Sequence, residues 1–254
     1  MNRLAGTHAL VTGGGSGIGA AIARTLADEG AAVTLVGRRR EPLEMVAATL
    51  PGAAIAVADV SLRQDVDAAL ADARAAQGPI SILINNAGVA PSAPFARTTL
   101  DQWRAAMNVN LDALFHCCQS ALPDLRAAQA GRIVSIASTA GLKGYAYTAA
   151  YAASKHGAIG LTRALALELA ATNVTVNAVC PGFTDTAILV DAVETIRTRT
   201  GRSEADARAE LAKFNPQRRL IDPQEVADAV AWLCLPSSGS VTGQSIVVAG
   251  GEVM

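Results

Sequence analysis

The sequence is poor in aromatic residues and has almost no net charge. Aromatic side chains make up 4% of the 254 residues, and the formal net charge at pH 7 is −1. A protein that attracts nucleic acid or an anionic membrane through its overall field needs a strongly basic balance, which is missing here. We therefore expect no nucleic-acid partner. The run Arg38-Arg39-Arg40 is a local exception.

Long apolar runs and paired cysteines are also missing. No uninterrupted apolar stretch reaches the roughly 18 residues that a membrane-spanning helix needs, and the first six residues lack the apolar run of a signal peptide. The cysteines form no C-x-x-C pair, which would indicate a zinc site or a disulfide framework. We therefore expect a cytoplasmic protein without metal, membrane association or disulfides. Its reduced thiols would be Cys117, Cys118, Cys180 and Cys234.

What the sequence does contain is a regular alternation of strand-like and helix-like segments. Aliphatic residues supply most of the apolar half of the chain, as in helices packed on a parallel sheet. Strands separated by helices imply right-handed βαβ units. We predict an α/β fold with a doubly wound, Rossmann-like parallel sheet and helices on both faces. The expected strands are 7–12, 32–36, 54–58, 81–85, 132–137, 174–179 and 244–248, and the expected helices include 17–29, 42–50, 62–76, 111–128 and 151–171.

The alternation continues past residue 150 without a linker, so residues 1–254 are interpreted as a single dinucleotide-binding domain. The charged segment 185–213 interrupts the rhythm. We interpret it as a helical substrate lid over the carboxyl ends of the strands, where ligands bind in open α/β sheets.

A glycine-rich loop follows the first expected strand. The backbone amides of such a loop, with a helix N-terminus behind them, bind a pyrophosphate without basic side chains. The strict G-x-G-x-x-G spacing fails, because an isoleucine stands where its last glycine should be. The context of strand, loop and helix still predicts a dinucleotide site. Its candidate residues are Gly13, Ser16, Gly17, Ile18 and Gly19.

The second strand ends at Gly37, directly before Arg38 and Arg39. A carboxylate at this point would bind the ribose 2′-hydroxyl of NAD, whereas an arginine accommodates the 2′-phosphate of NADP. We therefore favour NADP(H), with NAD(H) as the alternative. The alternative interpretation of these arginines is a solvent-exposed basic turn that starts the next helix.

Tyr151 and Lys155 are four residues apart in an expected helix, so they share one face. A tyrosine titrates near pH ~10, too high for ready proton exchange at neutrality. A nearby ammonium should lower the pKa of Tyr151 and make it a usable acid or base.

Taken together, these motifs resemble the short-chain dehydrogenase/reductase family in its compact branch of about 250 residues. The resemblance covers nearly the whole chain, and the motifs stand in the family's order. They are Thr12 to Gly19, Asp59-Val60, Asn85-Asn86-Ala87-Gly88, Asn110, Ser138, Tyr151, Lys155, and Pro181-Gly182 with Thr184 and Thr186.

The resemblance implies a role for each catalytic candidate. Ser138 would hydrogen-bond the substrate oxygen, and Tyr151 would donate or accept the proton. Lys155 would bind the nicotinamide ribose and lower the Tyr151 pKa, while Asn110 would hold a water on the proton path. The implied cofactor contacts are Asp59, Val60, Asn86, Ala87 and Gly88 on the adenosine side, and Tyr151, Lys155, Pro181, Gly182, Thr184 and Thr186 on the nicotinamide side.

The resemblance also implies a substrate class and an assembly. The substrate would be a small carbonyl or alcohol, first of all a 3-oxoacyl or 3-hydroxyacyl thioester linked to CoA or a carrier protein. Another ketone, sugar or cyclic alcohol is the alternative. A homotetramer would form through helices 111–128 and 151–171, where Leu161, Leu165 and Leu169 make a row that would serve an internal core equally well.

Residues 91–95, 138–147, Phe183 and the insertion should frame the pocket, with Ile188, Leu189 and Val190 in the lid. The basic residues of the insertion suit a phosphorylated carrier, but the acidic residues between them suit a plain solvated helix equally well. Two other classes of protein share parts of this pattern. A cofactor-sensing regulatory protein would not need the four catalytic candidates, and the extended epimerase branch has a different glycine loop and a larger C-terminal domain.

Overall fold

The computed structural model describes residues 2–254, apart from the side chains of Ile188 and Asp191. Within this part a seven-stranded sheet has the order β3-β2-β1-β4-β5-β6-β7, and every pairing is parallel. The predicted α/β fold with a doubly wound parallel sheet is confirmed. The strands are β1 (His8–Thr12), β2 (Ala32–Gly37), β3 (Ala54–Val57), β4 (Ile82–Asn85), β5 (Gly131–Ile136), β6 (Val174–Pro181) and β7 (Ser245–Val248).

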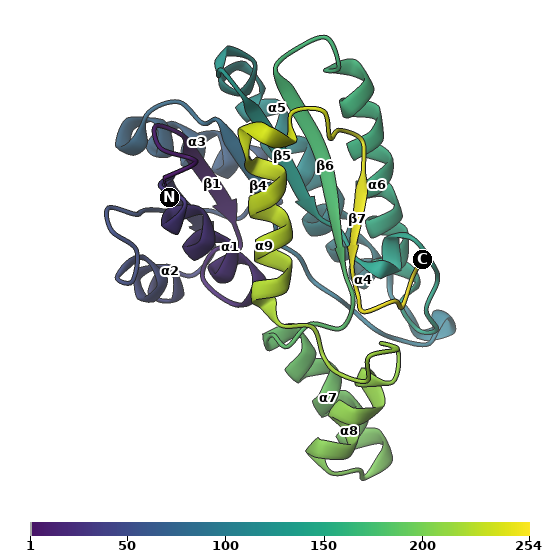
Figure 1. Ribbon diagram of the computed structural model, residues 1–254. Helices are drawn as coiled ribbons and strands as arrows, with labels where there is room; N and C mark the ends of the chain where they lie inside the picture. Colours follow the sequence, from purple (N-terminus) through teal and green to yellow (C-terminus); the bar gives the residue numbers. More distant parts are fainter. Residues whose placement is uncertain (1) are drawn as a thin grey trace.

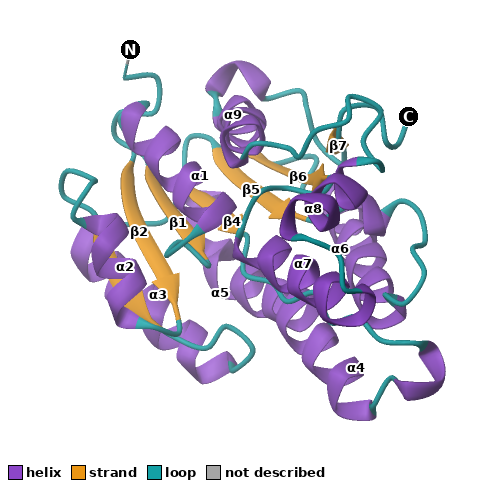
Figure 2. Ribbon diagram, turned by 90° about the horizontal axis from the view of Figure 1, so that it is seen from below, coloured by secondary structure: helices purple, strands orange, loops and turns teal. Residues whose placement is uncertain are grey.

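Helices cover both faces of this sheet (Figures 1 and 2). One apolar cluster joins the sheet to α1 (Gly17–Asp28), α2 (Arg40–Ala47) and α9 (Pro223–Cys234). The opposite cluster joins it to α3 (Arg63–Gln77), α5 (Ala113–Ala127) and α6 (Ala149–Glu168). The strands are buried on both sides, which explains their continuous apolar runs.

The strand order reverses between β1 and β4, which are neighbours in the sheet although β2 and β3 separate them in the chain. Such a switch point leaves a crevice at the carboxyl ends of the two strands, where open α/β sheets bind their ligands. The loop after β1 and the Asn86–Gly88 segment after β4 both begin there.

The segment predicted as a helical insertion forms α7 (Ala187–Thr200) and α8 (Glu204–Ala212). The two helices extend beyond the end of the sheet in Figure 1. They share a separate small core, with Phe183 packed against it. The buried members of this core are Leu189, Val193, Ala207 and Leu211.

The helix expected at 111–128 begins earlier and is not uniform. A separate helix α4 (Leu100–Met107) runs into a π-helical segment (Asn108–Asp112), which leads into α5. A capping box formed by Thr99 and Gln102 starts α4, and a second one formed by Asp222 and Glu225 starts α9. These patterns of a capping residue with Gln or Glu three positions later are visible in the sequence and mark both helices.

Among the described residues, no helix is both long enough and apolar enough to cross a membrane. The four cysteines are buried and free.

Candidate active site

The glycine loop is shaped by close packing that side chains would prevent. A Cβ on Gly19 would lie 2.2 Å from the carbonyl oxygen of Gly13, and one on Gly13 would lie 2.8 Å from the side-chain nitrogen of Asn86. Gly13 and Gly17 also have positive φ angles of 66° and 52°. Ser16 caps α1 in an extended conformation and makes no side-chain capping bond, which leaves its hydroxyl for a ligand.

Two side chains tie this loop to the end of β4. The Thr12 hydroxyl oxygen accepts hydrogen bonds from the backbone N–H of Asn86 at 2.9 Å and of Ala87 at 3.1 Å. The Asn86 amide in turn donates to the carbonyl oxygens of Thr12 at 2.9 Å and Gly13 at 3.2 Å. The Asn86 side chain was predicted to line the adenosine site, but its amide nitrogen makes hydrogen bonds within the protein. Thr12 supports the loop although it was not among the predicted site residues.

The adenosine end of the crevice carries one acidic and two basic candidates. Arg38 and Arg39 are exposed at the end of β2. Asp59 accepts two hydrogen bonds from Ser61, from the backbone N–H at 3.0 Å and from the hydroxyl at 2.7 Å. Burial opposes ionisation of Asp59, but these bonds and the charge of nearby Arg38 lower its pKa overall. Arg38 and Asp59 thus lie close together, and Val60 beside them is buried.

Three of the catalytic candidates come together from two elements. Ser138 follows β5, while Tyr151 and Lys155 lie on α6. The Ser138 hydroxyl accepts from the Ala140 N–H at 3.1 Å and hydrogen-bonds the Tyr151 phenol. The Lys155 ammonium lies 5.8 Å from the centre of the Tyr151 ring. This group has the donors needed at a carbonyl oxygen that gains negative charge.

The expected lowering of the Tyr151 pKa is wrong for the chain by itself. Burial raises the pKa of Tyr151, and the bond from Ser138 offsets only part of this effect. Burial also lowers the pKa of Lys155 to about 8. The Lys155 ammonium donates to the carbonyl oxygen of Ile136 at 2.7 Å rather than to the phenol, so its charge is directed elsewhere.

Asn110 is fully buried in the π-helical segment. Its side chain accepts from the Val89 N–H at 2.9 Å and donates to the Val89 carbonyl oxygen at 2.9 Å and the Ser154 hydroxyl at 3.0 Å. The amide thereby fixes the chain just after Gly88. A Cβ on Gly88 would lie 3.7 Å from the Lys155 ammonium nitrogen, so this glycine keeps the backbone close to the lysine.

The segment after β6 lies over the glycine loop. Pro181 pairs with Val248, and Thr184 donates through its hydroxyl to the Gly182 carbonyl oxygen at 3.0 Å. A Cβ on Gly17 would lie 3.1 Å from the Thr186 methyl carbon, which places Thr186 against the loop. The predicted nicotinamide-side residues therefore approach the predicted phosphate-binding residues.

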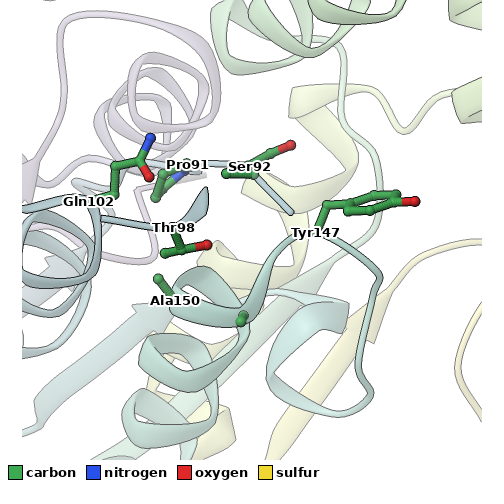
Figure 3. A pocket seen from close by; sticks show the side chains of 8 residues that line it. Pro91, Ser92, Thr98, Gln102, Tyr147 and Ala150 are labelled. Atoms are coloured by element: carbon green, nitrogen blue, oxygen red, sulfur yellow. The ribbon is translucent and has the colours of Figure 1, made fainter. Parts of the chain in front are cut away.

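Figure 3 shows a small pocket beside the start of α6, with the Tyr147 ring directed away from Thr98 and Gln102. Tyr147 has a positive φ of 68°, unusual for a residue other than glycine. Its carbonyl oxygen accepts from the Ala93 N–H at 2.8 Å. This bond joins the two loops that were predicted to frame the substrate pocket.

The basic residues of the insertion are mostly neutralised by neighbouring carboxylates. Each of four makes an ion pair with an acid on or beside α7 and α8, which favours the solvated-helix alternative. The pairs are Arg197–Glu194, Arg202–Glu210, Lys213–Glu210 and Arg208–Asp185.

The predicted leucine row is fully buried only at Leu169, whereas Leu161 and Leu165 are half-buried. Leu169 is buried and Leu165 packs against the core on the same side of the sheet. In the described part of the chain, no group of three His, Cys, Asp or Glu side chains could hold a metal ion.

Comparison with known proteins agrees with this geometry. A family model described as short chain dehydrogenase matches residues 7–197. The chain is 36% identical to the 3-oxoacyl-[acyl-carrier-protein] reductase of Vibrio harveyi, with 99% of each chain covered. It is 38% identical to the cis-4-hydroxycyclohexanecarboxylate dehydrogenase of Sinomonas cyclohexanicum, covering 96% of this chain and 95% of the relative.

A crystal structure of a variant of actinorhodin polyketide ketoreductase with NADPH superimposes with a TM-score of 0.93 at 36% identity, and 98% of each chain is covered. With a family match over most of the chain and full-length relatives above 30% identity, this chain belongs to the short-chain dehydrogenase/reductase family and is an oxidoreductase.

Proposed function

We propose that this chain is an NADP(H)-dependent reductase or dehydrogenase that acts on a 3-oxoacyl or 3-hydroxyacyl thioester. The observation that carries the proposal is the grouping of Ser138, Tyr151 and Lys155 at the carboxyl end of the sheet, beside the glycine loop. The Vibrio harveyi relative supports the thioester. The Sinomonas cyclohexanicum relative supports the alternative, a cyclic alcohol or its ketone.

The residues present fit a dinucleotide. The cradle at Gly13 and Gly19 has no room for a Cβ, and the free hydroxyl of Ser16 and the N-terminus of α1 favour a pyrophosphate. Asp59 and Asn86 to Gly88 would hold the adenosine side. Tyr151, Lys155 and the segment from Pro181 to Thr186 would hold the nicotinamide side.

When bound, the nicotinamide supplies or accepts a hydride at the substrate carbon. Ser138 would donate a hydrogen bond to the substrate oxygen and stabilise its developing charge. The Tyr151 hydroxyl would give its proton to this oxygen during reduction and take it back during oxidation. Because burial keeps the Tyr151 pKa high, the phenol holds its proton until the substrate oxygen becomes basic enough to receive it.

Lys155 would orient the ribose, and its ammonium would turn toward the phenolate as charge develops there. Asn110 would keep the chain at Val89 in place and order a water on the proton path. The preference for NADP(H) would rest on Arg38, assisted by Arg39, because both are exposed where a 2′-phosphate would lie and β2 ends on Gly37 rather than a carboxylate.

We also propose one domain over residues 1–254, with 185–213 as the substrate lid, and a homotetramer in the cytoplasm. The four free thiols support a reducing compartment. Phe115 on α5 is 50% exposed and Leu167 on α6 is 81% exposed, and such exposed apolar side chains on the two helices support a contact between copies. Sedimentation of wild type and Phe115→Asp checks the assembly: a tetramer that dissociates in the variant agrees with it, and a wild-type monomer contradicts it.

The central test is turnover of acetoacetyl thioesters and cyclic ketones with NADPH, in wild type and in Tyr151→Phe. The substitution removes only the transferable proton, so kcat should fall at least about 100-fold, while NADPH binding followed by fluorescence is kept. Tyr147→Phe removes a phenol from the same region but keeps the backbone bond to Ala93, and it should cost far less. Turnover of Tyr151→Phe within about tenfold of wild type would contradict the assignment.

A further inference from the structure

A buried acidic residue lies next to the proposed site, on the turn after β7. The Glu252 side chain is 1% exposed. Its backbone N–H donates to the Ala249 carbonyl oxygen at 3.1 Å, across two glycines with φ angles of 58° and 90°. A Cβ on Gly250 would lie 2.0 Å from the Asn215 side-chain oxygen, so only glycine lets this turn pack against the segment after α8. The turn therefore fixes where the carboxylate points.

One carboxylate oxygen of Glu252 holds a tyrosine and a lysine. The Tyr145 hydroxyl donates to Oε1, and the Lys143 ammonium nitrogen lies 3.4 Å from the same oxygen. The Tyr145 and Thr139 hydroxyl oxygens are 2.7 Å apart. Because a carboxylate only accepts hydrogen bonds, the Tyr145 hydroxyl donates its hydrogen bond to Glu252 and accepts one from the Thr139 hydroxyl. A hydrogen-bonded chain thus runs from the residue beside Ser138 to Glu252.

The Tyr145 phenol stays protonated in this arrangement. Burial raises its pKa, and the bond to Glu252 raises it further. The Lys143 ammonium lies 5.0 Å from the centre of the Tyr145 ring, a cation–π contact that limits ring motion from one side.

Tyr145 belongs to a group of three aromatic residues that we call the aromatic wall, formed by Tyr145, Phe183 and Phe214. The Tyr145 ring meets Phe183 at 6.2 Å and Phe214 at 5.9 Å, both edge-to-face, and the two phenylalanines are 5.1 Å apart. Phe183 directly follows Gly182, and Tyr145 is close enough to Tyr151 for the two phenols to affect each other's charge. The Tyr145 hydroxyl also lies 2.7 Å from that of Thr139, the residue directly after Ser138, so the aromatic wall approaches the proposed place of the reacting carbonyl from this side.

The second carboxylate oxygen of Glu252 is buried and has no hydrogen-bond partner among the described residues. It lies 2.8 Å from the position a Cβ on Gly182 would take. Glu252 thus fills the space between Tyr145 and the segment that begins at Gly182. A buried carboxylate with one unpartnered oxygen is a poor source of stability, so its contacts with Tyr145 and Lys143 point to a positional role instead.

We infer that Glu252 is a positioning residue for substrate selection: through Tyr145 it fixes the aromatic wall, which selects ketones with a flat aryl or cyclic group on the carbonyl carbon. The inference rests on the proposed reduction at Tyr151. An aryl ring packs well against edges and faces held at fixed angles, whereas a methyl group has too little surface to sense them. Without Glu252, the Tyr145 hydroxyl loses its acceptor and the ring loses its fixed orientation.

The test compares two esters that differ only at the carbonyl carbon, ethyl benzoylacetate (phenyl) and ethyl acetoacetate (methyl). Wild type should favour the phenyl ester in kcat/KM by at least about tenfold. In Glu252→Ala this ratio should fall about tenfold, mainly through KM for the phenyl ester. The kcat for ethyl acetoacetate should stay within about twofold, because Ser138, Tyr151 and Lys155 are untouched.

Three further variants separate positioning from general damage to the fold. Tyr145→Phe removes the same hydrogen bond without touching Glu252 and should lower the ratio equally, and combining it with Glu252→Ala should add nothing further. Glu252→Gln keeps an oxygen for the Tyr145 hydroxyl and should restore most of the ratio. Glu210→Ala, which removes an exposed carboxylate paired with Arg202 and Lys213, is the matched control and should leave the ratio unchanged.

The inference is overturned if the ratio stays within about twofold of wild type in Glu252→Ala and Tyr145→Phe, or if their effects add in full. Loss of NADPH affinity with an unchanged ratio would assign Glu252 to the support of Gly182 instead. Wild type that reduces neither these esters nor the ketones tested with Tyr151→Phe would refute the proposed function, and the inference with it. An active enzyme that prefers the methyl ester would refute the inference alone.

Discussion

Gly19→Ala is the substitution whose effect follows most directly from the structure. The new Cβ would lie 2.2 Å from the Gly13 carbonyl oxygen and 2.5 Å from the Asn86 side-chain nitrogen. Neither atom can move freely, because Gly13 is backbone and the Asn86 amide is held by its bonds to Thr12 and Gly13. The glycine loop must therefore shift by roughly 1 Å to reach ordinary contact distances.

The cost has two parts. Overpacking of a tight site costs about 1–3 kcal/mol, and disturbing the two Asn86 hydrogen bonds costs about 1 kcal/mol each. The higher helix propensity of alanine returns up to about 1 kcal/mol. We expect a net loss of about 2–4 kcal/mol in the free energy of unfolding. We also expect at least about a tenfold loss of NADPH affinity, because the displaced amides no longer face the pyrophosphate.

Urea unfolding measures the first quantity, and NADPH fluorescence titration measures the second. Arg24→Ala, an exposed position on the same helix, is the control and should change stability by less than about 0.5 kcal/mol. A Gly19→Ala protein with the stability and NADPH affinity of wild type would show that the loop is not held as described.

The remaining predictions concern the cofactor preference, the buried lysine and the support of the loop. Arg38→Leu should lower the ratio of kcat/KM for NADPH over NADH about tenfold. This is the low end of the effect expected for a charge-assisted phosphate contact, because Arg38 is exposed to solvent. An unchanged ratio would show that Arg38 plays no part in cofactor selection. Lys155→Met should be more stable than wild type at pH 7, because burial lowers the Lys155 pKa to about 8 from 10.5, so that in wild type the unfolded chain binds more protons between these values. The free energy of unfolding of wild type therefore rises with pH from about 8 to 10.5, and the extra stability of Lys155→Met over wild type should shrink. Thermal unfolding that shows this extra stability growing between pH 7 and about 9 would contradict the prediction. Thr12→Val should destabilise the protein by about 1–3 kcal/mol in urea, since the N–H groups of Asn86 and Ala87 lose their acceptor, and unchanged unfolding would contradict it.

The order of the elements was predictable because each strand is buried on both faces of the sheet and therefore consists of a continuous run of apolar residues. The catalytic candidates were predictable because the reaction needs particular side chains at particular spacings. The direction of the Tyr151 pKa was not, because it depends on how deeply the phenol is buried and on whether Lys155 points to it or to Ile136. No spacing in the sequence encodes either quantity.

Long-range partners were equally hidden. Glu252 and Tyr145 are 107 positions apart, and only the folded chain brings them into contact. The internal use of Asn86 depends on the close approach of two strand ends that are also distant in the chain. By contrast, residues only three positions apart, which form the capping boxes, specify where α4 and α9 begin.

The π-helical segment around Asn110 has a consequence for how this chain tolerates changes in length. A π-turn holds one residue more than the α-turn it replaces, and each residue of an α-helix advances the direction of its side chains by about 100°. Deleting one residue between positions 108 and 112 would turn this segment into an ordinary α-turn and leave α4 and α5 in nearly the same relation, yet the side chains inside the turn would be redistributed and the asparagine would turn away from Val89. A deletion here that keeps the helix is therefore more harmful than many substitutions, and a library that varies length should leave this segment intact.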